Sequence, residues 1–203
     1  SGPTETTDVG GKMTVLEQTF TVNHPRDVVW EMFADLPNVV TCMPGASLAG
    51  LPDEGHFAGL IAVKLGPIHA DFAGEGDVEL NDEEFSGAIR GYGLDIGHSS
   101  RARGEVNFVL AEEQDGSATR IDVVVAFSLS GTLAQFSRAG IVNAVADRLV
   151  EKFAANLEAV LGETDGAQSR PADSATELDM GSLVFSVMWN RIKAIFGSIF
   201  GRS

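Results

Sequence analysis

The strongest hydrophobic pattern in the chain lies between Gly140 and Leu161, where apolar residues recur every three or four positions. This spacing places them on one face of an α-helix, and that face requires a partner surface to bury it. Gly140 stands near the start of the pattern and Gly162 just past its end, where helix boundaries commonly lie. The pattern therefore predicts a long amphipathic helix over 140–161.

Alternating apolar and polar positions predict strands through most of the preceding chain. Turn residues such as Gly66-Pro67 and Asp115-Gly116 separate the alternating segments. The predicted strands are 14–22, 47–51, 56–65, 68–80, 84–93, 101–112 and 119–130. Their connections are too short for parallel crossovers, so we expect one antiparallel sheet of about seven strands.

Two short helices are predicted after the first strand, over about 25–34 and 38–43. Asn23 is expected to cap the first helix, and Asp35-Leu36-Pro37 is expected to end it. Strands followed by a long helix that covers the dry face of the sheet predict an α+β architecture.

Glycines interrupt the interiors of these strands, where they contribute no side chain to packing. They lie at Gly59, Gly74, Gly76, Gly87, Gly91 and Gly104. One interpretation is that they permit strong curvature of the sheet. The other is that they leave room for a ligand between sheet and helix, and the pattern is compatible with both.

Inward-facing apolar residues are the candidate binding site, because ligand pockets are mostly apolar with a few polar anchors. The predicted lining residues are Phe57, Ile61, Phe72, Phe108, Phe127, Leu129, Phe136, Val145, Leu149 and Phe153. Tyr92, with Arg101 or Arg103, is the candidate polar anchor. The alternative is that these side chains form a filled core.

Composition narrows the range of partners and compartments. The chain carries 14 Lys and Arg against 29 Asp and Glu, a net charge of −15, which argues against a nucleic-acid partner. A single cysteine, Cys42, excludes an intrachain disulfide and is expected to be an inert apolar side chain. The polar N-terminus does not resemble a signal peptide, so we expect a cytoplasmic protein.

Catalytic and metal-binding patterns are sparse in the chain. The histidines lie on separate segments without the spacing of metal ligands: His24, His56, His69 and His98. No P-loop, dinucleotide-binding or nucleophile-elbow motif is present in a credible context. We therefore expect a non-enzymatic protein without a metal.

The C-terminal segment differs chemically from the rest of the chain. Residues 180–203 contain three basic and no acidic residues, leaving 11 basic and 29 acidic residues, a charge of −18, for residues 1–179. An apolar helical stripe with basic residues predicts a helix lying flat on a membrane surface. Its predicted membrane-binding residues are Leu183, Val184, Val187, Met188, Trp189, Arg191, Ile192, Lys193, Ile195, Phe196, Ile199 and Phe200. The alternative is that this helix docks on the domain or on a partner protein.

The predicted organisation is a disordered segment 1–12, a domain over 13–162, a flexible linker 163–178 and an amphipathic helix 179–203. Three segments of the domain resemble the CoxG-like family, named for the G component of carbon monoxide dehydrogenase, within the START-like (SRPBCC) superfamily: DLPNVVTCMPG (35–45), VKLGPIHADFAG (63–74) and SGTLAQF (130–136). The resemblance implies a helix-grip fold, in which a curved seven-stranded antiparallel sheet wraps around the long C-terminal helix and forms a cavity.

The resemblance also implies a role beside the molybdenum CO dehydrogenase. We expect a carrier for a lipophilic molecule, an isoprenoid quinone such as menaquinone or ubiquinone, peripherally associated with the inner face of the cell membrane. The alternatives are an adaptor that recruits the enzyme to the membrane without a ligand and, with least support, an enzyme acting on an apolar substrate.

Overall fold

The computed structural model describes residues 13–137 and 139–166. Its strands are β1 (Thr14–Val22), β2 (Ala46–Leu48), β3 (His56–Leu65), β4 (Ile68–Asn81), β5 (Ser86–Asp95), β6 (Ser100–Glu113) and β7 (Ala118–Ser130). Its helices are α1 (Arg26–Ala34), α2 (Leu36–Cys42) and α3 (Ala139–Gly166), with short 3₁₀ turns η1 (Gln114–Gly116) and η2 (Gly131–Phe136).

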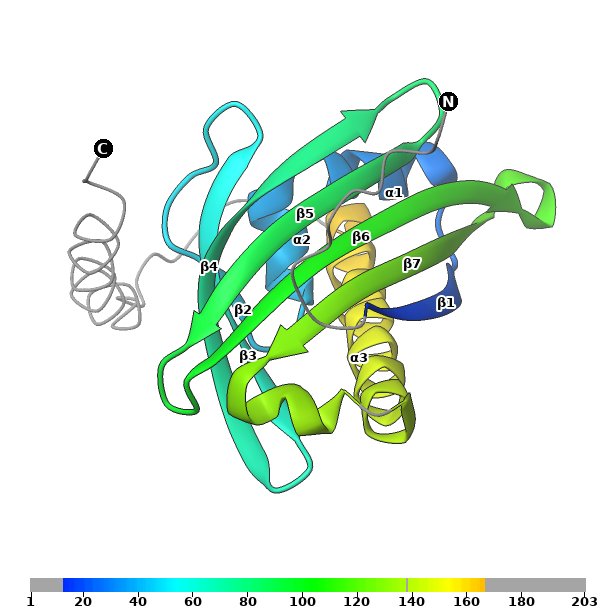
Figure 1. Ribbon diagram of the computed structural model, residues 1–203. Coiled ribbons are helices and arrows are strands. Elements are labelled where there is room, and N and C mark those ends of the chain that lie inside the picture. The colour runs from blue at the N-terminus through cyan, green and yellow to red at the C-terminus, as the bar shows by residue number, and fades with distance from the viewer. Residues whose placement is uncertain (1–12, 138, 167–203) are drawn as a thin grey trace, which may run out of the picture.

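The strands form one antiparallel sheet in the order β1-β7-β6-β5-β4-β3-β2. The sheet curves around α3, which contacts β1 near one edge of the sheet and β3 near the other, while α1 and α2 cover the same side (Figure 1). We call the side of the sheet that faces α3 the inner face. The predicted α+β architecture, with a seven-stranded antiparallel sheet around a long helix, is confirmed.

The boundaries of α3 differ from the prediction at its C-terminal end. The helix continues through Gly162 to Gly166, so the first four residues of the predicted linker are helical. A glycine within a helix lowers stability by only about 1 kcal/mol and does not by itself end the helix. The predicted disordered segment 1–12, the rest of the predicted linker (167–178) and the predicted amphipathic membrane helix 179–203 lie outside the described residues.

The N-terminal cap of α1 also differs from the prediction. Asn23 does not cap the helix; its backbone N–H and its side-chain amide both donate to Glu158 of α3, at 2.6 and 3.2 Å. Asp35 instead caps α2, because its side chain accepts from the backbone N–H of Asn38 at 3.2 Å. The segment predicted to end one helix therefore also begins the next.

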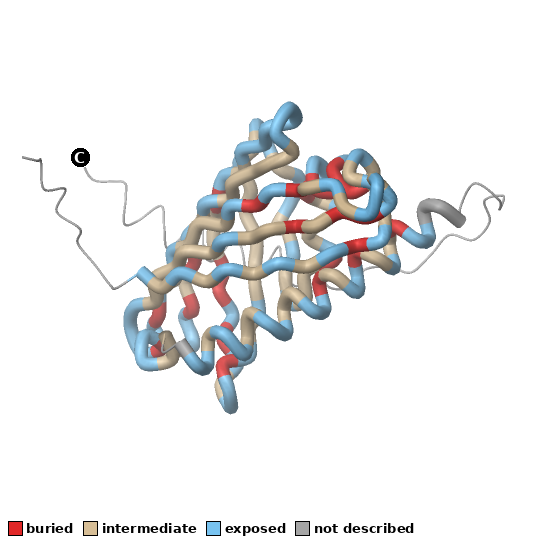
Figure 2. The backbone as a smooth tube through the Cα atoms, turned by 90° about the vertical axis from the view of Figure 1, so that its right-hand side faces the viewer, coloured by how far each residue is buried: buried red, intermediate tan, exposed pale blue. Residues whose placement is uncertain are grey.

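Two separate apolar clusters hold the layers together. The larger, which we call the upper cluster, joins α1, α2, the C-terminal half of α3 and the ends of β1, β6 and β7. Its buried residues are Val22, Val29, Trp30, Met32, Phe33, Cys42, Phe108, Leu110, Ile121, Phe153, Leu157 and Leu161. The smaller, the lower cluster, joins the β3–β4 hairpin to η2 through Leu65, Ala70, Phe72 and Leu133. Between them, strand residues are mostly half-buried (Figure 2).

Close approach of neighbouring strands explains the glycine at position 74. A side chain there would overlap the carbonyl oxygen of Tyr92 on β5, so only glycine permits this spacing in the curved sheet. Gly104 is different, because an added Cβ would lie 3.6 Å from its nearest neighbours, an ordinary van der Waals distance. Close approach of neighbouring atoms therefore explains Gly74, whereas Gly104 has room for a methyl group.

We predict that Gly74→Ala and Gly104→Ala will differ sharply in their effect on stability. Alanine at position 74 must push β4 and β5 apart and is expected to lower the free energy of unfolding by about 2 kcal/mol or more. Alanine at position 104 fits and is expected to change it by less than about 1 kcal/mol. Urea denaturation measures both, and equal losses would contradict this account of the sheet.

Candidate ligand-binding site

Burial of the apolar face of α3 is complete only in its C-terminal half. Phe153, Leu157 and Leu161 are 8%, 0% and 4% exposed, respectively. Two further residues of the same face in the N-terminal half, Val145 and Leu149, are only partly buried. The helix therefore packs tightly against the upper cluster and loosely beyond it.

The sheet shows the same gradient along β7. Ile121 is fully buried, whereas Val125 and Phe127 further along the same inward-facing row are only half-buried. Val125 pairs with Val106 of β6, and Phe127 pairs with Gly104. Burial of the inward-facing row is thus less complete at these positions than at Ile121.

Leu149 lies on α3 between two residues of the same helix face whose partners are known. Phe153, one helical turn away, contacts Phe20 of β1 with ring centroids 5.8 Å apart, and Phe20 pairs with Ile121. One turn in the other direction, Val145 packs on the lower cluster together with Leu129. Leu149 therefore lies on the inward-facing side of α3, between the upper and lower clusters. We call the set Gly91, Gly104, Val106, Val125, Phe127 and Leu149 the central inner face.

The other predicted lining residues divide between the two packed ends. Phe108 and Phe153 belong to the upper cluster, whereas Ile61, Phe72, Leu129, Phe136 and Val145 belong to or pack on the lower cluster. The ring of Phe57 lies over Gly76 on the inner face, close enough to exclude a side chain there. Of the predicted set, Phe127 and Leu149 lie at the incompletely covered centre.

Tyr92 does not belong to the interior. Its side chain is on the outer face of the sheet, 45% exposed, and its hydroxyl donates to Glu75 at 3.1 Å. Partial burial raises the pKa of Tyr92, and the carboxylates of Glu75 and Asp77 raise it further. Arg103, its cross-strand partner, and Arg101 are also exposed. The prediction that Tyr92 is a polar anchor inside the fold is therefore wrong: adjacent residues of a strand face opposite sides, and Tyr92 is on the outer face.

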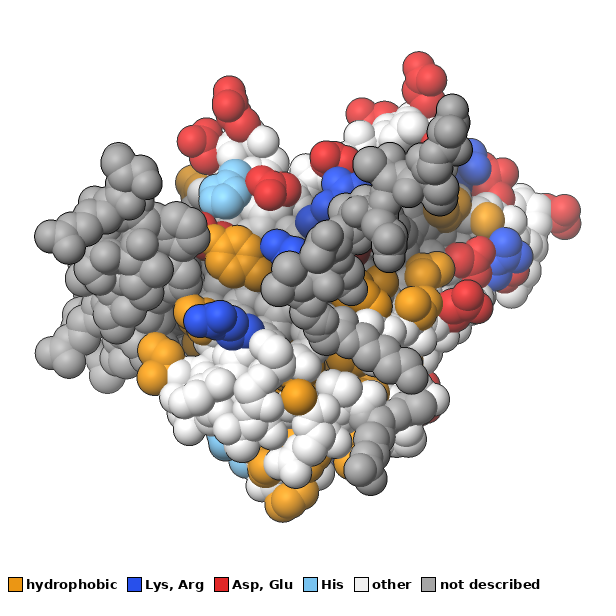
Figure 3. All heavy atoms as spheres, viewed as in Figure 1, with side chains coloured by type: hydrophobic (Ala, Val, Ile, Leu, Met, Phe, Trp, Pro, Cys, Tyr) orange, Lys and Arg blue, Asp and Glu red, His pale blue; other side chains and the backbone are white. Residues whose placement is uncertain are grey.

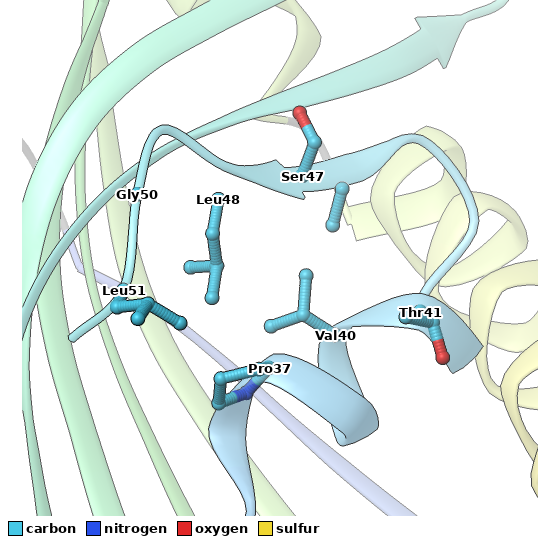
Figure 4. A pocket seen from close by; sticks show the side chains of 8 residues that line it. Pro37, Val40, Thr41, Ser47, Leu48, Gly50 and Leu51 are labelled. Atoms are coloured by element: carbon cyan, nitrogen blue, oxygen red, sulfur yellow. The ribbon is translucent and has the colours of Figure 1, made fainter. Parts of the chain in front are cut away.

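A surface pocket of about 420 Å³ lies between α2 and β2 (Figure 4). We call it the α2–β2 pocket. It is lined by Pro37, Val40, Thr41, Ala46, Ser47, Leu48, Gly50 and Leu51. None of these was in the predicted lining set, although the segment 35–45 that carried the family resemblance forms one wall.

Polar groups near the lower cluster bind one another. The buried carboxylate of Asp95 accepts from the backbone N–H of His98 at 3.3 Å and contacts its ring Nδ1 at 2.8 Å. The Ser100 hydroxyl donates to the His98 carbonyl and accepts from the backbone N–H of Leu133. These bonds tie the β5–β6 turn to η2 and satisfy a buried carboxylate.

Charged groups gather on the outer face of the sheet (Figure 3). Arg90 binds Glu79 at 3.0 Å and Glu105 at 3.4 Å, and the hydrogen bond with Glu79 is the main cause of its raised pKa. Burial raises the pKa of the Cys42 thiol, which disfavours the reactive thiolate. Within residues 13–137 and 139–166, no three His, Cys, Asp or Glu side chains are grouped to hold a metal ion.

Comparison with known families matches residues 19–162 to the family of the carbon monoxide dehydrogenase G component, CoxG. The chain belongs to this family. The match spans the whole sheet from the end of β1, both short helices and most of α3, and so includes the central inner face and the α2–β2 pocket. No curated protein matches the chain in a second comparison.

Solved structures share the START-like fold. A conserved protein from Geobacillus kaustophilus is 14% identical, with a TM-score of 0.65 over 74% of this chain and 97% of its own. The ZhuI aromatase/cyclase from Streptomyces sp. R1128 is 19% identical, with a TM-score of 0.53; the match covers 81% of this chain and 100% of the cyclase chain. A START superfamily protein from Mycobacterium smegmatis is 14% identical, with a TM-score of 0.50; the match covers 74% of this chain and 98% of the other chain.

We predict that alanine substitutions along α3 will show the packing gradient directly. Leu157→Ala removes a fully buried side chain and is expected to lower the free energy of unfolding by roughly 2–5 kcal/mol. Leu149→Ala removes a half-buried side chain facing accessible space and is expected to cost about 1 kcal/mol. Chemical denaturation of both variants is the test. A loss at Leu149 as large as that at Leu157 would indicate a filled core.

Proposed function

We propose that this member of the CoxG family binds an isoprenoid quinone on the central inner face and carries it between the molybdenum CO dehydrogenase and the membrane. The observation that supports this most is the incomplete cover over the inner face between the two clusters. Val125 of β7 and Leu149 of α3 both lie on inward-facing surfaces between the clusters, yet neither is fully buried. An apolar ligand there would bury surface that the protein itself leaves open.

The chemistry of the central inner face favours a lipophilic ligand. Its side chains are aliphatic or aromatic, and its glycines expose backbone without adding charge. Asp95 and His98, the ionisable residues beside the lower cluster, bind each other. Acid–base catalysis on a substrate at the centre therefore has no proton donor or acceptor among these residues. Accordingly, we propose a binding function, although one structural neighbour is named an aromatase/cyclase.

The family assignment supports a quinone as the ligand class. Oxidation of carbon monoxide releases two electrons, and a quinone accepts two electrons with two protons while remaining lipophilic. A protein that shelters such a carrier would connect the enzyme to an acceptor dissolved in the bilayer. None of the helices in the described part of the chain is long and apolar enough to cross a membrane. Peripheral attachment through residues 179–203 remains part of the proposal.

An adaptor function has separate support from the outer face. Val15, Val109 and Val124 are 59%, 47% and 40% exposed there. Exposed β-branched residues on a sheet face are candidates for contact with a partner protein. In this case CO dehydrogenase would dock on the outer face, and the inner face would hold no ligand.

We predict that the full chain binds decylubiquinone, a short-chain quinone, and that Leu149→Trp weakens this binding by about tenfold or more, because indole would occupy the central inner face. Val124→Trp on the outer face is the matched control and should bind as the unaltered chain does. Fluorescence titration measures both affinities. Absence of saturable binding by the unaltered chain would favour the adaptor function.

A further inference from the structure

We infer that the α2–β2 pocket is the port through which the hydrocarbon chain of the ligand reaches the central inner face, with α2 as the movable wall. This inference rests on the proposed function and identifies how its site is reached. It concerns residues outside the central inner face. The two can therefore be tested by different variants.

The walls of the pocket suit a hydrocarbon chain. Pro37 and Val40 of α2 face Leu48 of β2 and Leu51 of the following loop (Figure 4). No charged residue lines it. The hydroxyl of Thr41 donates to the carbonyl of Asn38 at 2.6 Å, so it is already satisfied within α2. The volume lies within the range of about 300–1,000 Å³ that small-molecule sites occupy.

The strand register places a row of small residues between the pocket and the inner face. Leu48 pairs with Gly59 of β3, and the same cross-strand row continues through Gly74, Gly93, Ala102 and Leu129. Between Leu48 and Leu129, the row carries no side chain larger than a methyl group. The neighbouring row runs from Phe57, whose ring lies over Gly76, through Gly91 and Gly104 to Phe127. Few side chains therefore stand on the strands between the pocket and the central inner face, along the route that we infer for the ligand.

The attachment of α2 to the rest of the fold is concentrated at its two ends. Its buried residues, Leu36 and Cys42, lie at its two ends. The side-chain amide of Asn156 on α3 donates to the Cys42 carbonyl at 2.9 Å. The chain leaves α2 through Pro44 and Gly45, which has a φ of +78° and is followed at once by β2. Short helices with few buried side chains are among the segments that open at lowest free energy.

Leu51 marks the outer rim of the port. It is 87% exposed, the highest exposure among the large hydrophobic residues of the described ranges. An exposed leucine beside an apolar pocket offers a first contact for a hydrocarbon chain arriving from a membrane or an enzyme surface. The rim, the pocket and the glycine rows therefore form one apolar route into the fold.

Stopped-flow measurements with decylubiquinone test the port, using the full chain. Val40→Trp fills the pocket, so we expect both the association and dissociation rates to fall by about tenfold while the dissociation constant stays within about twofold. Asn156→Ala releases α2 from α3, and both rates should rise with the same unchanged affinity. Val124→Trp on the outer face serves as the control and should leave both rates unaltered.

The outcomes separate the port from the site. Unchanged rates in both Val40→Trp and Asn156→Ala would overturn the port, even if Leu149→Trp weakens binding. A weaker affinity for Val40→Trp with normal affinity for Leu149→Trp would also overturn it, because the pocket itself would then be the site. No binding by the unaltered chain would overturn both the port and the proposed function.

Discussion

The structure depends on how one rigid amphipathic helix is buried by a strongly curved sheet. α3 is 28 residues long, and its two halves pack against different groups of side chains. Aromatic contacts anchor one half, including Phe153 against Phe20 and Phe33. The β3–β4 hairpin and η2 support the other. A straight helix cannot follow the concave sheet closely along its whole length, and residues in the middle of the inner face are only half-buried. We propose that the ligand binds there.

Much of the fold could be predicted because local patterns and tertiary packing agree. The strands Thr14–Val22 and His56–Leu65 begin and end where alternation and turn residues indicate. The predicted cap at Asn23 failed because its hydrogen-bonding groups bind Glu158, 135 residues further along the chain. The glycines carried two interpretations. Close approach of backbones accounts for Gly74. Gly104 has room for a methyl group, and the interpretation that the glycines leave room for a ligand stays a prediction.

The candidate site was less predictable, for two physical reasons. Strand alternation identifies which residues share a face, but it does not show how completely a helix covers them. From the sequence, Phe108 and Phe127 were therefore equally good candidates for the lining of a pocket. Strand alternation could have excluded Tyr92 from the lining, because Tyr92 is adjacent in sequence to Gly91, which faces inward, and adjacent residues of a strand face opposite sides. The α2–β2 pocket forms only when α2 folds onto β2. Residues 35–45 resemble the family, but no local sequence pattern in this segment indicated that it forms the wall of a pocket.

Methyl NMR of the full chain during titration with decylubiquinone tests the central claim most directly. The account predicts saturable shifts for the methyl groups of Val125 and Leu149, because both border the open centre, and little change at Ile121 and Leu157, which are fully buried in the upper cluster. Shifts confined to Val109 and Val124 on the outer face, or no saturable shift at any methyl group, would contradict it.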